Sequence, residues 1–231
     1  MNDERLEQAQ HDARRVAAPV VLLAAGVDVL LALASAWHNW RLYAANDWWV
    51  WIVLALPAAA LACVFLLGLG RMGVSSRHRR RTAVVLLVLL AAANLAGIGL
   101  VIGSLVHGGA HMTGPQLLAS AGVVLVVNVI TFGLAFWELD NGGPVARALA
   151  ERRARPDFQF PQDENPQLAR PDWSPALNDY LYLALTNSIA FSPTDAMPLT
   201  HRAKLLMGIE AVIAAVTVLL VAARAVNILH G

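Results

Sequence analysis

Residues 179–229 read DYLYLALTNSIAFSPTDAMPLTHRAKLLMGIEAVIAAVTVLLVAARAVNIL and combine three patterns in one stretch. A short segment with a polar stripe is followed by the loop AFSPTDAMPLT, residues 190–200, and then by an apolar run at 205–228. A hydrocarbon core about 30 Å thick needs about 20 apolar residues in a helix, so the last run predicts a transmembrane helix. The helix before it must stop at Pro193 after roughly 25 Å. Its length predicts a re-entrant helix or a sixth crossing, packed among other helices.

Four further apolar runs precede this stretch. The 231 residues are 58% hydrophobic and only 14% charged, a balance that a soluble domain of this size cannot bury. Backbone polar groups in a bilayer need internal partners, and the alternating polarity of barrel strands is absent, so helices are expected. The sequence therefore predicts an all-α, polytopic membrane bundle with five clear transmembrane helices. The four earlier runs are 17–37, 48–70, 82–106 and 115–137.

The arginines and lysines predict the orientation, because loops rich in them stay in the cytoplasm. The N-terminal tail has three arginines, the loop 71–81 has five and the segment 138–174 has five, whereas 38–47 and 107–115 together have one. We therefore expect a multi-pass protein of the cell (inner or plasma) membrane with a cytoplasmic N-terminus. The predicted regions are a cytoplasmic tail (1–16), a four-helix transmembrane bundle (17–138), a cytoplasmic Pro/Arg-rich linker (139–174), and a pore-loop-like half-helix with the last transmembrane helix (175–231).

The linker and the half-helix that follows it carry local signals. Five of the chain's eleven prolines fall in the linker, so a short basic surface helix is expected at 145–155 and extended chain at 156–172. Glu138 and Asp140, at the inner end of the fourth span, are expected to pair with linker arginines. Ser174 before Pro175 predicts the start of the half-helix.

One face of the half-helix is polar. Asn178, Tyr182 and Thr186 recur at i, i+4 and i+8, with Asn187 beside them, and a polar turn covers Ser192 to Asp195. The candidate polar path consists of Thr186, Asn187, Ser192, Pro193, Thr194 and Asp195.

The loop resembles the pore loop of potassium channels, whose pattern is Thr-Val-Gly-Tyr-Gly-Asp-x-x-Pro-x-Thr. The C-terminal part is also similar to a family of uncharacterised bacterial inner-membrane proteins known only as a domain of unknown function. That similarity rests on residues 179–182, 190–195 and 223–228. The resemblance covers less than a quarter of the chain and implies a homo-oligomer with a channel-like path for an ion or small solute.

Two departures alter what the resemblance implies. Both filter glycines are missing, and Ser192, Pro193 and Thr194 occupy a segment whose carbonyl ladder needs left-handed backbone that β-branched threonine resists. In addition, the arginine count makes the fourth span run inward, where a channel module needs it to run outward. We therefore expect a degenerate pore loop that is not of the potassium type. A cytoplasmic entry of the half-helix is favoured, because it keeps Arg202 and Lys204 inside.

Polar side chains inside the apolar runs are the other candidate site residues. A carboxylate near the middle of a span costs about 3 kcal/mol or more unless it is protonated or paired. Asp28 and Glu210 are such carboxylates, and together they predict a buried protonatable site in a small transporter or ligand-binding bundle. Asn94 and Asn128 are expected to join helices, and Arg224 to pair with Asp28 or extend to the interface.

The sequence predicts no enzyme, no cofactor, no metal site and no nucleic-acid partner, because it lacks a nucleotide-binding glycine loop and a nucleophile–base pair. Its partner is the lipid bilayer. Three hypotheses remain open: a channel-like protein with a degenerate pore loop, a small transporter or ligand-binding bundle using Asp28 and Glu210, and a non-conducting structural or accessory membrane protein.

Overall fold

The computed structural model describes residues 2–40, 47–67, 76–107, 113–149, 156–167, 169–170, 173–192 and 196–229. Five of the helices in these ranges are long and apolar enough to cross a membrane, which confirms the prediction of an all-α bundle with five candidate spans. They are α1 (Asn2–Trp37), α2 (Trp49–Leu67), α3 (Ser76–His107), α4 (Gly114–Leu139) and α8 (His201–Leu229).

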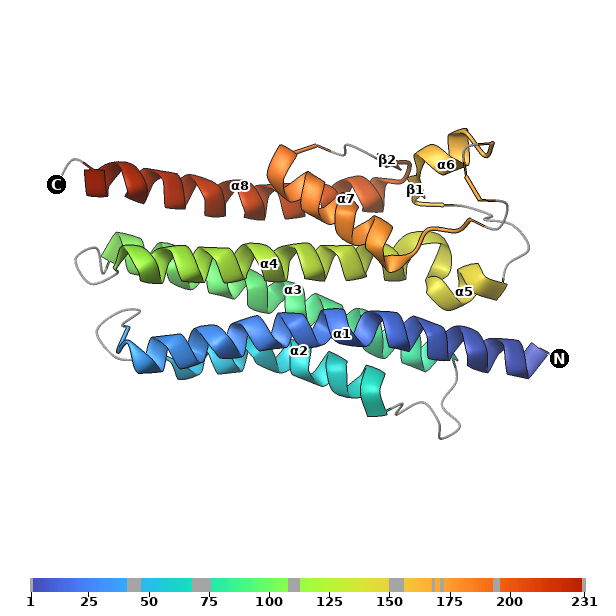
Figure 1. Cartoon of the computed structure of the whole chain (residues 1–231), viewed down its shortest axis with the longest axis horizontal. Helices are drawn as coiled ribbons and strands as arrows, with labels where there is room; N and C mark the ends of the chain where they lie inside the picture. Colours follow the sequence, from blue (N-terminus) through green and yellow to red (C-terminus); the bar gives the residue numbers. More distant parts are fainter. Residues whose placement is uncertain are drawn as a thin grey trace.

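The five long helices lie side by side, with α4 in the middle of the bundle (Figure 1). Helix α4 packs against α1 and α3 and, on its other side, against α8 and the short helix α7 (Leu177–Ala190). The chain begins at one end of the bundle, and α8 finishes at the opposite end (Figure 1). The end of the bundle at which α4 finishes is called the linker end. The opposite end, at which α4 begins, is called the far end.

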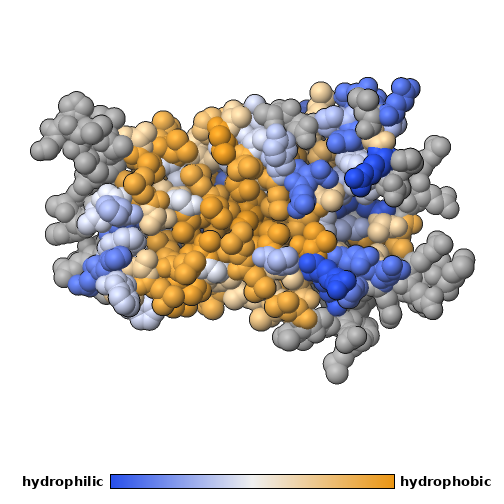
Figure 2. Space-filling view, in the orientation of Figure 1, coloured by the Kyte–Doolittle hydropathy of each residue, from blue (hydrophilic) through white to orange (hydrophobic). Residues whose placement is uncertain are grey.

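The outside of the bundle is apolar over its middle and more hydrophilic towards its ends (Figure 2). Large apolar side chains such as Leu30, Val88, Leu118 and Leu219 are more than half exposed. Exposed apolar surface on this scale is stable only where lipid covers it. The surface therefore agrees with the five apolar helices that indicate a membrane-embedded protein.

One residue of α4, Gly133, shows why α7 can lie so close to it. A Cβ added at Gly133 would lie 2.7 Å from the Leu181 Cδ2 atom and 3.1 Å from the Leu181 Cα atom. Only glycine leaves room for the α7 backbone at this point. The contact places the buried face of α7 directly against the central helix.

The linker is more structured than the sequence predicts. The 3₁₀ turn η1 (Asp140–Gly142) leads into α5 (Pro144–Leu149), and Asn141, Gly142 and Gly143 all have positive φ angles of 50°, 86° and 99°. The helix expected at 145–155 is thus shorter within the described residues, and 150–155 lies outside them. Arg147 is buried rather than on a basic surface, because it folds back onto the end of α4.

The segment 156–172 is not simply extended as expected. It contains β1 (Phe158–Gln159) and α6 (Pro161–Glu164), and β1 pairs in antiparallel fashion with β2 (Met197–Pro198). The pairing brings the chain after α7 back to the linker end, where α8 begins (Figure 1).

Helix α7 therefore enters from the linker end and its chain returns to the same end. Its 14 residues make about 21 Å of helix, too short for a hydrocarbon core of about 30 Å. Ser174 does not cap it, contrary to the expectation. Instead the Asp179 carboxylate accepts a hydrogen bond from the backbone N–H of Ala176 at 2.7 Å. At its other end, the helix is followed by Phe191, whose backbone is in the left-handed region with φ 53°.

Candidate functional site

A layer of buried polar side chains crosses the bundle near the middle of its long helices. It joins Asn94 of α3, Asn128 of α4, Asn187 and Ser188 of α7 and Glu210 of α8, all at most 5% exposed. Helices α3, α4 and α8 contribute apolar neighbours on either side, so the layer is enclosed by hydrocarbon. We call these five residues the polar layer.

Glu210 is the charged member of the polar layer and has no exposed surface. Its Oε2 atom accepts a hydrogen bond from Asn187 Nδ2 at 2.7 Å, and its Oε1 atom accepts one from Ser188 Oγ at 3.1 Å. Asn187 Nδ2 also donates to the carbonyl of Met207 at 2.9 Å. The end of the short helix α7 thus supplies both donors to a carboxylate on α8.

Asn128 connects the two halves of the bundle. Its Oδ1 atom accepts from Asn94 Nδ2 at 3.1 Å, while its Nδ2 atom donates to Ser188 Oγ at 3.4 Å and to the Glu210 carbonyl at 3.3 Å. One side chain therefore joins α3, α4, α7 and α8. The side-chain amide of Asn128 thus uses both its NH₂ group as a donor and its carbonyl oxygen as an acceptor.

Asp28 lies on α1, 5% exposed, at a small cavity that it shares with Asn94. The cavity is about the size that one water molecule needs. The remaining wall is uncharged, and none of its residues can titrate. It consists of Trp51, Leu54, Leu90, Ala93, Gly97, Val124 and Val127.

The structure brings four of the predicted residues together: Asn94, Asn128, Asn187 and Glu210. Asp28 lies next to this group, at the cavity that it shares with Asn94. Ser188 was missed. Its signal was the spacing of Tyr180, Ala184 and Ser188 at i, i+4 and i+8, which marks the buried face of α7.

The other candidate residues lie elsewhere. The Thr186 hydroxyl donates to carbonyls of its own helix, at Tyr182 (3.0 Å) and Leu183 (3.1 Å), and Ser192 is exposed. Asn178 and Tyr182, on the predicted polar stripe, are exposed too. Pro193, Thr194, Asp195 and the side chain of Arg224 lie outside the described residues.

A second polar cluster closes the linker end, and we call it the linker latch: Asp140, Arg147, Asp157, Tyr180 and Arg202. The Asp140 carboxylate accepts from the backbone N–H groups of Asp157 (2.6 Å) and Phe158 (3.4 Å) and from the Tyr180 hydroxyl (2.5 Å). Arg147 donates to the carbonyls of Trp137 (2.8 Å) and Asp140 (2.6 Å) and lies 5.2 Å from the Tyr180 ring centre.

Asp157 fixes the start of α8 to the linker. Its carboxylate accepts from Thr200 Oγ1 at 2.6 Å and from Arg202 Nε at 2.6 Å, and Arg202 Nη2 binds its second oxygen. Burial raises the pKa of the Asp157 carboxyl, but the hydrogen bonds from Arg202 and Thr200 and the charge of Arg202 outweigh it. The net result is a pKa below the usual range.

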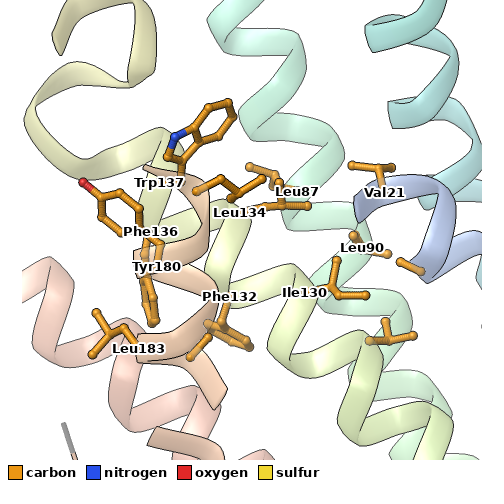
Figure 3. Close-up of a cluster of buried hydrophobic side chains, with 14 of the residues drawn as sticks. Val21, Leu87, Leu90, Ile130, Phe132, Leu134, Phe136, Trp137, Tyr180 and Leu183 are labelled. Carbon is orange, nitrogen blue, oxygen red and sulfur yellow. The ribbon is translucent and has the colours of Figure 1, made fainter. Parts of the chain in front are cut away.

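Between the polar layer and the linker latch lies a continuous apolar cluster. Figure 3 shows Val21 of α1, Leu87 and Leu90 of α3, Ile130 to Trp137 of α4, and Tyr180 and Leu183 of α7 meeting there. Aromatic rings dominate its linker side, where Phe136, Phe158 and Tyr180 are in contact at centroid distances of 5.1 Å and 6.2 Å.

We expect the linker latch to weaken in acid. Because the pKa of Asp157 is lowered in the folded protein, its stabilising effect is complete above the unfolded value of about 4 and is lost as the pH falls through the folded value. Thermal unfolding in detergent should therefore show a lower midpoint as the pH falls below about 4, and Asp157→Asn should reduce this dependence. The exposed Asp12 provides a matched Asp12→Asn control. An unchanged pH profile in Asp157→Asn would contradict the assignment.

The described part of the chain holds no group of three or more His, Cys, Asp or Glu residues arranged for a metal ion. What the polar layer can do chemically is hold or release a proton on a carboxylate and bind small polar species through amides and a hydroxyl. Comparison of the chain with protein-family models, curated proteins and solved structures finds no match.

Proposed function

We propose that this integral membrane protein is a small transporter that binds and releases protons at its polar layer. The observation that carries the proposal is Glu210, a fully buried carboxylate held by Asn187 and Ser188 between α4, α7 and α8. Ionisable side chains inside membrane proteins are costly, and they mark pathways or binding sites more often than simple packing contacts.

Helix packing alone does not account for this arrangement. The Asn94–Asn128 hydrogen bond already joins α3 to α4, and neutral side chains at the Glu210 position would avoid the cost of a buried carboxylate. Asp28 of α1 adds a second buried carboxylate, beside Asn94. Two buried carboxylates give the bundle two places where a proton can reside.

The short helix α7 forms one wall of the site. It ends at the polar layer, has no full span, and is held at its other end by the linker latch. A transporter needs its binding site to sit near the membrane centre between elements that can shift relative to each other. We further propose that the linker end faces the cytoplasm, as the distribution of arginines indicates.

Proton flux into proteoliposomes tests the proposal. Vesicles containing trapped pyranine and a potassium gradient are treated with valinomycin, and the internal pH is followed. The wild-type protein should carry protons down the imposed potential. Glu210→Gln should reduce the flux to the level of protein-free vesicles, because glutamine keeps the size and the hydrogen-bond acceptor but cannot titrate.

Glu164→Gln is the matched control, since Glu164 is exposed on α6 at the linker end. It should leave the flux unchanged. Flux in Glu210→Gln equal to that of the wild type would rule out Glu210 as the proton site. If the wild type carries no protons while Glu210→Gln only loses stability, the protein is a structural or accessory membrane protein.

A channel-like function is the second candidate, favoured by the course of α7, which enters and returns at one end as a pore helix does. It is ranked second because Asn187 and Ser188 point into the subunit, while the outer positions Leu185 and Ile189 are apolar. A channel needs several copies around a shared axis. The mass of the protein in detergent therefore separates the two functions: a monomer excludes an axial pore.

A further inference from the structure

Buried polar side chains are distributed unequally on the two sides of the polar layer. Towards the linker end, the described helices place Thr131 alone between the layer and the linker latch. Towards the far end, buried polar side chains continue on four helices. They are Ser35 on α1, Ser104 on α3, Gln116 and Ser120 on α4, and Thr217 on α8.

These residues lie between the polar layer and the far end because of the directions in which the helices run (Figure 1). Helices α1, α3 and α8 run towards the far end, and α4 runs away from it. Ser104 is ten residues after Asn94, about 15 Å along α3, and Thr217 is seven residues after Glu210, about 10 Å along α8. Ser120 is eight residues before Asn128, about 12 Å along α4.

Two small cavities lie at and beyond the polar layer. The first, the cavity of Asp28 and Asn94, lies at the level of the layer, and the second lies further towards the far end between α3, α4 and α8. Val124 lines both of them, so its side chain stands between the two spaces. Thr217 lines the second cavity together with Val101 and Leu117. Each cavity is about the size that one water molecule needs.

Apolar side chains fill the described structure on the linker side. The apolar cluster of Figure 3 occupies the space between α1, α3, α4 and α7, and the aromatic contacts of Phe136, Phe158 and Tyr180 lie behind it. The Ser104 Oγ atom towards the far end and the Thr131 Oγ1 atom on the linker side are both buried without a hydrogen-bond partner in the described structure. The second cavity, however, lies towards the far end, so the two ends of the bundle differ in how water can approach the carboxylates.

We propose that protons carried on single water molecules reach the polar layer from the far end, through the two cavities that meet at Val124. The proposal rests on the transporter function above and specifies its substrate as a proton rather than a larger solute. Asp28 lies at the inner cavity and is the first carboxylate on this route, with Asn94 between it and Asn128. Val124 is the narrow point, and its side chain controls entry.

The size of the side chain between the two cavities tests the route in proteoliposomes. Val124→Leu should reduce proton flux, because the extra methylene group fills a space that holds only one water molecule, and Val124→Ala should increase the flux, because it widens the same point. Ile130→Val is the control, since Ile130 lies on the same helix as Val124, is similarly buried and lines neither cavity. It should leave the flux unchanged.

The outcomes separate this route from the proposed function. Proton flux in the wild-type protein that neither Val124→Leu nor Val124→Ala changes overturns the route and leaves the transporter function intact. Absence of proton flux in the wild-type protein counts against the transporter function, on which the route rests. A change in flux in Ile130→Val as large as in the Val124 variants overturns the route, because the effect is then not specific to the cavities.

Discussion

Asp140→Ala should lower the free energy of unfolding by about 3–5 kcal/mol, the largest loss of stability expected from a single change in the described chain. The Asp140 carboxylate satisfies the backbone N–H groups of Asp157 and Phe158 and the Tyr180 hydroxyl, all of them buried. Alanine removes the acceptor that these three donors share, and the loss of a buried acceptor costs about 1–3 kcal/mol for each donor that finds no other. The segment β1 and the base of α7 should then separate from the end of α4.

Unfolding in detergent, followed by tryptophan fluorescence, measures this effect. Trp173 lies 6.0 Å from the Phe160 ring, and Trp137 is buried at the end of α4, so both report on the linker end. Asp163→Ala is the control, because Asp163 accepts from the N–H of Phe160 at a partly exposed site. Its effect should stay below about 1 kcal/mol. Equal effects of the two substitutions would mean that Asp140 does not hold the linker latch.

The sequence was sufficient to predict the five long helices, because a membrane span depends on the length of one continuous apolar run. It was also sufficient to select Asp28 and Glu210, since a carboxylate within such a run stands out without any knowledge of the fold. The re-entrant course of α7 was favoured for a similar reason: Pro193 limits the helix to fewer residues than a span needs.

The sequence could not predict the partners of these residues. Glu210 and Asn187 are 23 residues apart and Asn94 and Asn128 are 34 apart, so their contacts depend on how the helices pack. The polar stripe of Asn178, Tyr182 and Thr186 misled the prediction of the inward face, because hydrophobic neighbours cover α7 on its Tyr180 and Leu183 side. That side instead carries Asn187 and Ser188 to the centre.

The linker latch illustrates the same limit. Asp140 was expected to pair with linker arginines, and one of them, Arg147, donates to the carbonyl of Asp140. The sequence did not indicate that the Asp140 carboxylate also accepts from backbone N–H groups and from Tyr180. The positive φ angles of Asn141 to Gly143 turn the chain so that a backbone group of β1 reaches this carboxylate. Local backbone geometry is thus what directs each oxygen to its partner.

Asn128→Leu is the change expected to weaken the polar layer most, by about 2–4 kcal/mol. It removes three hydrogen bonds at once and leaves Asn94 Nδ2 without its acceptor, in a place where water is largely excluded. Each intramembrane hydrogen bond contributes about 0.6 to 1.7 kcal/mol, which sets the range. Proton flux should also fall, because Ser188 loses its donor and no longer holds Glu210 in a fixed position.

Asn94→Leu provides the comparison, since it removes only the Asn94–Asn128 hydrogen bond of the layer and should cost about a third as much. Unfolding of both variants and of the double variant in detergent gives the coupling between the two positions. If Asn94 acts only through Asn128, the double variant is no less stable than Asn128→Leu. A further loss of stability in the double variant would place part of the Asn94 contribution at the Asp28 cavity. A cost below about 0.5 kcal/mol for Asn128→Leu alone would mean that α7 is held only by the linker latch and by apolar packing.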